Sequence, residues 1–508
     1  MFLKKIEKLI FRIENSKVPF AYFLSTFFFL IIFRYFLEMF STDFLFSPSD
    51  FYHIFLFFLS CLLTFVLLFH FSTKENIEKI VRFLFLSFGV ILLTPLLDII
   101  LTKGKGYKMT YILPGVHKNL LLRFLTFGGS FHKDGLSPGI KIEVGLILLG
   151  CFVYFLIKNK NIFKSLFFTF LAYLIIFLFG IAPFLAKAFL QLFNLQYRFS
   201  ASLMINFYLL LLFILSIWIF YLYNKKFCIE IFKDIRPFRL LHYELMFMLG
   251  FVIREVSFMG DKAQFSQELL FSWIFIIIAI MYAGLFSGIT NNLADYEIDK
   301  ISNPNRPTVA NTIPIKEYKM LSGVFLMLAI IYSLAASYMS LFLILLLIGS
   351  YFLYSVPPLR LKRITFFSKI LISLNAITVM MLGYSLNSIN YSIFLPSKII
   401  FFSLIFLTAS INFIDIKDYK GDKKAGIKTL PVILGLEKSK KVIGLFFLIS
   451  YLAFYFLLKD NFLLPFLILF GIIEFLLINR KKYNEKPVFL VYLLSVISLI
   501  IYLLFFNF

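Results

Sequence analysis

The sequence is poor in charge, and in acid above all. Only 15% of its 508 residues are charged, and 27 Asp and Glu stand against 50 Lys and Arg. Hydrophobic residues make up 61% of the chain, and 72 residues are Phe. Soluble globular domains average about 45–50% apolar and about 25% charged residues. The composition therefore excludes an ordinary soluble domain.

Cysteine is scarce as well. Cys61 and Cys151 fall inside apolar runs, and Cys228 lies near a basic stretch. No CxxC pair occurs, so neither a disulfide framework nor a zinc site is indicated.

Apolar runs of the length that crosses a bilayer recur along nearly the whole chain. They predict an all-α protein, a polytopic transmembrane helical bundle of about 15 spans. The expected spans lie near residues 18–40, 51–72, 80–102, 140–157, 163–190, 200–223, 240–257, 270–292, 318–338, 339–356, 368–388, 395–414, 440–458, 461–478 and 487–506.

The net charge of +23 follows the positive-inside rule, because most Lys and Arg lie in alternate short loops. We expect a multi-pass protein of the cell membrane, surrounded by membrane lipids, with its N-terminus in the cytoplasm. The basic, amphipathic segment 1–17 is expected to be an interfacial helix. Nucleic acid is not expected as a partner, because no basic soluble domain is present. The loop 103–139 is an exception, because it is basic although the span count places it outside the cytoplasm. It is either an interfacial element or the sign of a miscounted span.

The basic stretch 224–239 predicts a domain boundary. Residues 1–235 would form a domain of about six spans with no recognisable site. Residues 236–508 would form a domain of nine spans that holds all the motifs.

Two acidic clusters end apolar runs in this second part. Asn291, Asp295 and Asp299 are spaced i, i+4 and i+8, and the second set is spaced i, i+3 and i+7: Asp415, Asp418 and Asp422. Each set is expected on one face of a helix. Carboxylates beside hydrocarbon are costly and usually functional. Facing each other, the two sets would offer oxygen ligands suited to Mg²⁺ and the phosphates it carries.

Cations and a tyrosine join the acids on the same expected face of the membrane. They lie in segments 303–307, 354–363 and 425–431. Metal and cations together can neutralise a departing diphosphate. The prenyl cation that an allylic diphosphate leaves can be stabilised by aromatic faces.

With these motifs, residues of about 236–506 resemble the UbiA family of intramembrane prenyltransferases, whose members have nine transmembrane helices. The first motif of the family, Asn-Asp-x-x-Asp-x-x-x-Asp, matches Asn291 to Asp299 with one departure. Asn292 stands where the family has Asp. The second motif, Asp-x-x-Asp-x-x-x-Asp, matches Asp415 to Asp422 in full. Residues 1–235 show no such resemblance.

The resemblance implies a Mg²⁺ cofactor, a polyprenyl diphosphate substrate and a set of roles for individual residues. Asp295, Asp299, Asp418 and Asp422 would be catalytic, and with Asn291 and Asp415 they would hold the metal. Asn292 would be a weaker ligand or a supporting residue. The diphosphate would be bound by Arg306, Tyr354, Lys362 and Lys428.

The acceptor is less defined. Arg236 and Arg239 precede or begin the first helix of the second part, where they would hold an acidic acceptor or only anchor the chain at the membrane. We expect a small aromatic acceptor of the quinone-biosynthesis type. The alternatives are a glycerol phosphate backbone, as in ether-lipid synthesis, and phosphoribosyl transfer to polyprenyl phosphate. A cation-coupled transporter is a different class, but transporter sites lie near the bilayer midplane, whereas these acids end the spans.

Overall fold

The computed structural model describes residues 2–42, 45–104, 106–112, 120–129, 136–192, 200–257, 267–386, 394–424 and 426–506. All regular structure in these ranges is helical, which confirms the all-α prediction. The chain divides into two compact units, Met1–Cys228 and Ile229–Phe508. We refer to them as unit 1 and unit 2. The expected boundary at residues 235 and 236 falls slightly later and stays a prediction.

Unit 1 begins with the amphipathic helix α1, which confirms a helix in the basic N-terminal segment. Its helices are α1 (Phe2–Glu14), α2 (Phe20–Thr42), α3 (Pro48–Thr73), α4 (Ile77–Ser87), η1 (Phe88–Leu92), α5 (Leu93–Leu101), α6 (Leu120–Leu125), α7 (Pro138–Asn159), α8 (Ile162–Gly180), α9 (Ala182–Leu192) and α10 (Ala201–Tyr223). Helix α11 (Lys225–Asp234) crosses the division between the units. Of the basic loop 103–139, residues 105, 113–119 and 130–135 lie outside the described residues.

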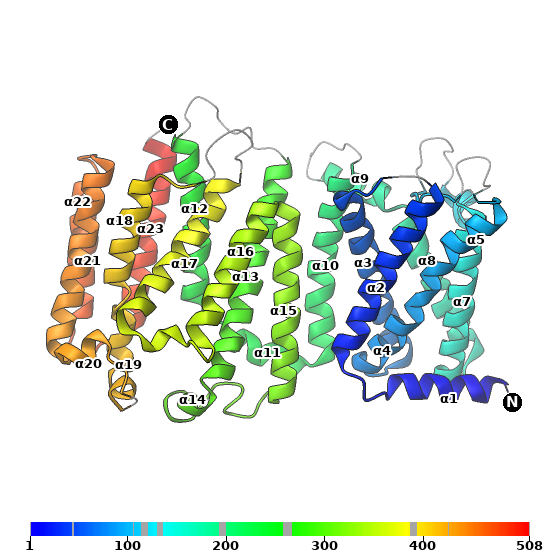
Figure 1. Ribbon diagram of the computed structural model, residues 1–508, viewed down its shortest axis with the longest axis horizontal. Coiled ribbons are helices and arrows are strands. Elements are labelled where there is room, and N and C mark those ends of the chain that lie inside the picture. The colour runs from blue at the N-terminus through cyan, green and yellow to red at the C-terminus, as the bar shows by residue number, and fades with distance from the viewer. Residues whose placement is uncertain are drawn as a thin grey trace. The chain divides into compact units, whose positions relative to one another are not determined.

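Unit 2 is a bundle whose long helices run side by side (Figure 1). Its helices are α12 (Pro237–Ser257), α13 (Gln267–Ala294), α14 (Tyr296–Ser302), α15 (Ile315–Ala336), α16 (Tyr338–Ser355), η3 (Leu361–Arg363), α17 (Thr365–Ser385), α18 (Ser397–Ser410), α19 (Phe413–Lys424), α20 (Leu430–Leu434), α21 (Leu436–Leu458), α22 (Leu464–Ile478) and α23 (Glu485–Phe506). Helix α13 packs along α15, and α12 packs along α17.

Among the described residues, twelve helices are long and apolar enough to cross a membrane, or thirteen if the bent pair α18 and α19 is one span. Two expected spans, at 240–257 and 461–478, correspond to α12 and to the shorter α22, neither of which is among the twelve. The run at 163–190 divides into α8 and α9. The count of fifteen therefore stays a prediction, while a multi-pass membrane protein is established.

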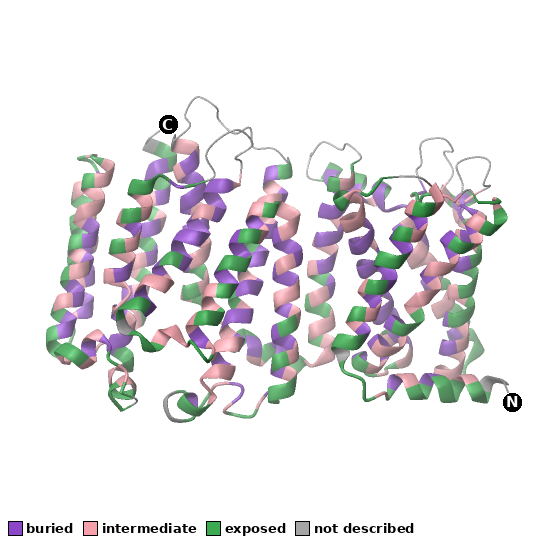
Figure 2. Ribbon diagram, in the orientation of Figure 1, coloured by how far each residue is buried: buried purple, intermediate pink, exposed green. Residues whose placement is uncertain are grey.

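Large apolar side chains cover the outer faces of the helices. Phe163 on α8 and Phe366 on α17 are 80% and 73% exposed. Buried and exposed faces alternate around the helices of each unit (Figure 2). Exposed aromatic and aliphatic side chains on this scale suit hydrocarbon rather than water.

Two glycines set the close approach of α12 and α17. A Cβ atom added at Gly250 would lie 1.9 Å from the backbone oxygen of Met380, and one at Gly383 would lie 1.9 Å from that of Phe247. No side chain fits such gaps. Small residues at helix contacts in membranes allow this kind of packing, which replaces the hydrophobic drive available in water.

We expect Gly383→Val to destabilise unit 2, because the added carbon atoms force α12 and α17 apart. Overpacking of this kind costs about 1–3 kcal/mol or more. The apparent melting temperature of the purified protein in detergent, followed by size-exclusion chromatography, measures the effect. Gly349→Val on α16 is the matched control, since a Cβ there meets nothing within 4 Å. Equal melting temperatures for the two variants would contradict the packing argument.

Candidate active site

Both acidic clusters lie at the same end of unit 2, where Figure 1 shows α14 and α19 below the long helices. The first cluster comes from the end of α13 and from α14. The second lies on α19, after the bend that follows α18. The segment around η3, which joins α16 to α17, supplies cations.

The first cluster does not lie on one continuous helix, which corrects the expectation from its spacing. Helix α13 ends at Ala294, and Asp295 is the residue before α14. Hydrogen bonds of helical spacing nevertheless continue, from Asp295 N to Asn291 O at 2.9 Å and from Asp299 N to Asp295 O at 2.8 Å. Asp295 itself has φ −98° and ψ 9°, outside the α-helical range, and Asp is a residue that favours local polar contacts over regular helix.

Asp295 is held by two cations from the η3 segment. Arg360 donates to Asp295 Oδ1 at 2.5 Å and to the carbonyl of Ala294 at 3.3 Å. Lys362 donates to Asp295 Oδ2. Lys362 also donates at 3.2 Å to Asn291 Oδ1, which accepts a second hydrogen bond from Ser355 at 2.9 Å. Lys362 is therefore in contact with the first cluster, and its role toward a diphosphate stays a prediction.

Asn292 faces a different set of partners. Its side chain is fully buried, and its Nδ2 donates to Asp234 Oδ2 at 2.5 Å and to the Tyr318 hydroxyl at 2.9 Å. Tyr318 in turn donates to Asp234 at 3.2 Å, and Arg306 forms an ion pair with the other Asp234 oxygen. Asp234 therefore places a carboxylate beside the residue that replaces the Asp of the family motif.

Asp299 is 5% exposed and accepts a hydrogen bond from Asn303 at 2.9 Å. Burial raises the pKa of its carboxyl group, against the opposing hydrogen bond from Asn303. Burial likewise lowers the pKa of Lys362, against the attraction of Asp295. Both shifts have the same physical cause, so this end of unit 2 is partly shielded from water, and charges interact there more strongly than in bulk solvent.

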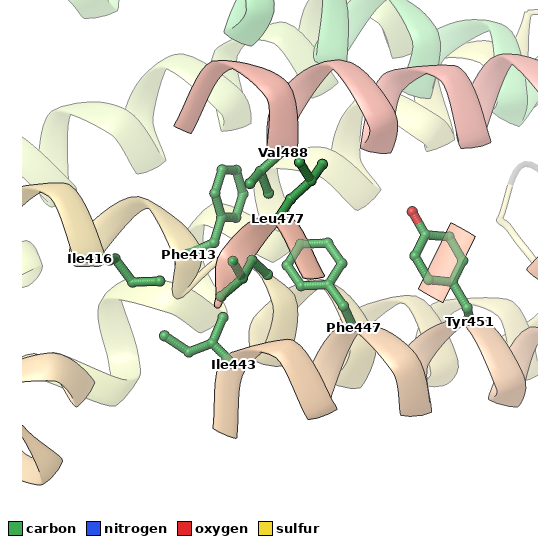
Figure 3. Close-up of a cluster of buried hydrophobic side chains, with 8 residues drawn as sticks. Phe413, Ile416, Ile443, Phe447, Tyr451, Leu477 and Val488 are labelled. Atoms are coloured by element: carbon green, nitrogen blue, oxygen red, sulfur yellow. The ribbon is translucent and has the colours of Figure 1, made fainter. Parts of the chain in front are cut away.

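The second cluster is carried by a single helix, as its spacing predicts. Phe413 and Ile416 anchor α19 in an apolar cluster with residues of α21, α22 and α23, among them Phe447 and Val488 (Figure 3). On another side of α19, Asp415 is 7% exposed and accepts from Lys369 at 2.5 Å. The second oxygen of Asp415 has no hydrogen-bond partner among the described residues.

The two clusters share neighbours. Tyr354 lies close enough to both Asp295 and Asp415 for their charges to act on it, and Arg239 acts in the same way on Tyr354 and Asp418. Asp418 is exposed and Asp422 half-buried on α19, and Lys428 is exposed on the segment that follows.

A cavity of about 150 Å³ joins this polar end to the interior of the bundle. We call it the site cavity. Arg236, Arg239, Asn291 and Tyr354 line it at one end, and its wall continues along α13 to Ile280. At 1.5 Å per residue, Ile280 and Asn291 are about 16 Å apart along the helix. The site cavity therefore reaches from the first cluster into the apolar part of the bundle.

The donor chemistry fits a hard divalent cation. Carboxylate and amide oxygens predominate, and buried oxygens of Asp415 and Asn292 have no partner among the described residues. Among those residues, no three His, Cys, Asp or Glu side chains are gathered as a ready metal site. Lys362, Arg360 and Lys369 pair with the carboxylates instead.

Sequence reasoning missed Asp234, Tyr318, Arg360 and Lys369 as members of this site. Asp234 had one signal, an acid within the basic stretch before α12. Arg360 lies in segment 354–363, whose cations the sequence brings to the acids without a role for Arg360, and Lys369 lies outside that segment. The carboxylate partner of each is more than 40 residues away in the chain, so sequence alone does not show the pairing.

These features define a multi-pass helical membrane protein with an acid-rich site at one end of its second unit. Residues 256–497 match the model of the UbiA prenyltransferase family, and the C-terminal half of the chain belongs to that family of prenyl-transferring enzymes. The match lies wholly within unit 2.

The similar proteins include digeranylgeranylglyceryl phosphate synthases and plant prenyltransferases. The digeranylgeranylglyceryl phosphate synthase of Thermococcus sibiricus is 28% identical over 213 residues, 41% of this chain and 69% of the relative. The 2-acyl-4-prenylphloroglucinol 6-prenyltransferase of Humulus lupulus is 31% identical over 209 residues, 37% of this chain and 48% of the relative. The chain thus spans about half to two thirds of the curated relatives that it matches.

Among solved structures, a UbiA homolog from Archaeoglobus fulgidus bound to GPP and Mg²⁺ is similar. It is 21% identical, with a TM-score of 0.43, and the match covers 55% of this chain and 99% of that chain.

Because Asn292 and Asp234 are hydrogen-bonded to each other, we expect substitutions at the two positions to have coupled effects on stability. Asn292→Asp alone would bring two carboxylates together in a buried place, and Asp234→Asn alone would leave Arg306 without its partner. We expect both single variants to lower the melting temperature. The double variant, which exchanges the two side chains, restores most of the loss, with a coupling energy of about 0.5–3 kcal/mol, typical of residues in contact. Additive effects of the two changes would show that the pair does not act as a unit.

Proposed function

We propose that unit 2 transfers a polyprenyl group from its diphosphate to an acceptor in a reaction that depends on Mg²⁺. The observation that carries the proposal is the site cavity. It joins Asp234, the amide of Asn291 from the first cluster, two arginines and Tyr354 at one end to an apolar wall that suits part of an isoprenoid chain. Membership of the prenyltransferase family supports the same reading.

Asn291, Asp295, Asp299, Asp415, Asp418 and Asp422 are the residues proposed to hold the metal, whose positive charge would stabilise the oxygens of the diphosphate. Asp295, Asp299, Asp418 and Asp422 are proposed as the catalytic members. Asn292 supports the first cluster through Asp234 rather than as a charged ligand.

In this proposal the basic side chains pair with carboxylates in the free protein and with phosphate oxygens in the complex. Without substrate, Lys362 and Arg360 neutralise Asp295, and Arg306 neutralises Asp234. A bound diphosphate brings phosphate oxygens to the same place, where Lys362, Arg306, Tyr354 and Lys428 can donate hydrogen bonds to it. The allylic C–O bond then breaks, and its electron pair leaves with the diphosphate. The acceptor forms the new bond to the prenyl carbon and loses a proton.

The aromatic rings near the site suit the prenyl cation that develops as this bond breaks. Tyr243, Tyr351 and Tyr354 all line the site cavity, and the hydroxyl groups of Tyr243 and Tyr351 are hydrogen-bonded to each other. Aromatic faces attract cations, and they do so more strongly where water is excluded.

An acidic acceptor fits the part of the site cavity that is lined by arginine. Arg236 and Arg239 line it, and burial, followed by the repulsion of Arg239 and Arg306, lowers the pKa of Arg236. Three arginines close together, with Asp234 as a neighbouring acid, favour an anion. An aromatic carboxylate and a glycerol phosphate backbone both meet this requirement, and the named relatives include one ether-lipid synthase and one aromatic prenyltransferase.

We place the site at the cytoplasmic face. Basic residues concentrate at this end of unit 2, with Arg360, Lys362 and Arg363 around η3 and Lys417, Lys420, Lys423 and Lys424 on α19. The positive-inside rule assigns such an end to the cytoplasm.

Asp295→Ala and Asp418→Ala are each expected to abolish prenyl transfer, because each removes a carboxylate that the metal and the diphosphate require. Membranes that carry each variant are incubated with labelled geranylgeranyl diphosphate and acceptor, and the products are counted after extraction. Glu297→Ala is the matched control, since Glu297 is exposed on α14 and pairs with Lys300. Wild-type turnover in either Asp variant would remove that residue from the site.

Removal of the metal is expected to stop turnover without unfolding the chain. Treatment with EDTA should eliminate product, and added Mg²⁺ should restore it, while the melting temperature of the free protein stays nearly constant. Full turnover in chelator would contradict the metal-dependent mechanism.

A panel of acceptors separates the two acceptor chemistries. The membranes receive geranylgeranyl diphosphate with either 4-hydroxybenzoate or geranylgeranylglyceryl phosphate, and products are identified by mass spectrometry. Arg239→Gln should raise the KM for whichever acceptor reacts and change kcat less. An acceptor without any acidic group that reacts equally well in wild type and variant would exclude this role for Arg239.

A further inference from the structure

Unit 1 contains a second cavity, of about 310 Å³, among α3, α4, α7 and α8. We call it the unit 1 cavity. Aromatic rings dominate its wall, including Phe57, Phe65, Phe83 and Phe177. Along α3 the lining extends from Phe57 to Phe69, which is about 18 Å at 1.5 Å per residue. A mostly apolar space of this volume and this length along α3 is within the range of small-molecule sites, which begins at about 300 Å³.

One part of the wall carries charge. Arg34 and Glu143 both line the unit 1 cavity and are 2% and 8% exposed. The guanidinium lies 3.2 Å from Glu143, a distant partner, and 3.2 Å from Glu38, its i, i+4 neighbour on α2. It also donates to the carbonyl of Ile91 and lies 5.1 Å from the centre of the Phe58 ring. Arg34 therefore has a fixed position beside apolar space.

The charges of this wall are balanced. Arg34 is compensated by Glu38 and Glu143, and Thr94 donates a further hydrogen bond to Glu143. Lys141 lines the cavity as well and donates to the carbonyl of Gly129 at 2.6 Å. Two cations and two carboxylates leave no excess positive charge to attract an anion, and a phosphate or carboxylate head would lie beside Glu143 in the wall.

One donor remains. The Nε of Arg34 is buried and has no hydrogen-bond partner in the part of the chain that the structure describes. Buried polar groups are nearly always satisfied, and an exception needs an explanation. An acceptor oxygen on a bound molecule would supply the missing hydrogen bond.

We propose that the unit 1 cavity binds a lipid with a single apolar chain and an uncharged, oxygen-bearing head, an alcohol or a carbonyl, which accepts a hydrogen bond from Arg34. The aromatic wall holds the chain, and the balanced ion cluster selects against a charged head. This site does not depend on the transfer activity proposed for unit 2.

Photolabelling of the full chain in lipid nanodiscs tests the proposal. The probe is a hexadecanol that carries a diazirine in mid-chain and an alkyne for recovery, and the labelled peptides are identified by mass spectrometry. We expect labelling of α3, α7 and α8 at residues that line the cavity, with competition by unlabelled hexadecanol. The matching hexadecanoic acid probe should label these peptides several-fold less at a pH where it is ionised.

Two glycines on α7 provide matched variants. Gly150 lines the unit 1 cavity and Gly145 does not, and a Cβ added at either meets nothing within 4 Å. Gly150→Trp should fill the cavity and reduce labelling several-fold, whereas Gly145→Trp should leave it unchanged. Equal labelling in the two variants, or labels spread evenly over the outer faces of the helices, would identify the probe as bulk lipid and overturn the proposal.

The head group has its own test. Arg34→Lys keeps the positive charge between Glu38 and Glu143 but removes the Nε donor. In the wild type, the alcohol probe should label the cavity more strongly than a hydrocarbon probe of the same length. In Arg34→Lys we expect the two probes to label it equally. An unchanged advantage would overturn the contact with Arg34, and stronger labelling by the acid than by the alcohol would overturn the choice of an uncharged head. Because no readout involves prenyl transfer, failure here is distinct from failure of the function proposed for unit 2.

Discussion

Buried and half-buried carboxylates at the ends of membrane helices need cations, and the structure of the site follows from where those cations come from. An isolated ionised group away from water costs far more than one ion pair returns, so a carboxylate in such a place is stable only with a partner in good geometry. Asp295 takes its partners from the η3 segment, Asp415 from the start of α17, and Asp234 from the segment before α15. Each pair joins parts of unit 2 that are distant in sequence. Charge compensation therefore positions the connections as well as the acids.

The same pairs explain how one set of side chains serves both the free and the bound protein in the proposed reaction. A cluster of carboxylates with no counter-charge would repel itself, and a cluster of cations beside a diphosphate site would do the same. Placed together, they neutralise each other in the free state. A diphosphate with its metal then brings both signs of charge, so every group can exchange its partner without being left unpaired. The balanced cluster of Arg34, Glu38 and Glu143 in unit 1 follows the same rule.

What could be predicted from sequence was local. The spacing of Asp415, Asp418 and Asp422 predicts one helical face, and α19 is one helix, because its apolar residues Phe413 and Ile416 have neighbours to pack against. The i, i+4 pair of Arg34 and Glu38 was equally accessible. The break between α13 and α14 at Asp295 could not be predicted. Neither could the ion-pair and hydrogen-bond partners Asp234, Glu143 and Lys369, since they depend on which helices become neighbours in the bundle. Charged α12 and short α22 read as apolar runs in the sequence, but neither is among the twelve described helices that are long and apolar enough to cross a membrane, so the count of fifteen stays a prediction.

Asn292, which stands where the family motif has Asp, shows that the charge at a motif position depends on neighbouring side chains as well as on the residue itself. An amide in place of a carboxylate removes one negative charge, and the fully buried position of Asn292 would make a second carboxylate there costly. Asp234 lies within hydrogen-bond distance of that amide and is neutralised by Arg306. The negative charge is thus present at this place, but it comes from the segment before α12 instead of from α13. Because Arg236 and Arg239 follow closely in the same segment and line the site cavity, the relocated charge links the first acidic cluster to the wall proposed to bind the acceptor. Next to Asn292 the negative charge is therefore supplied by Asp234, on the segment that carries the two arginines proposed to bind the acceptor.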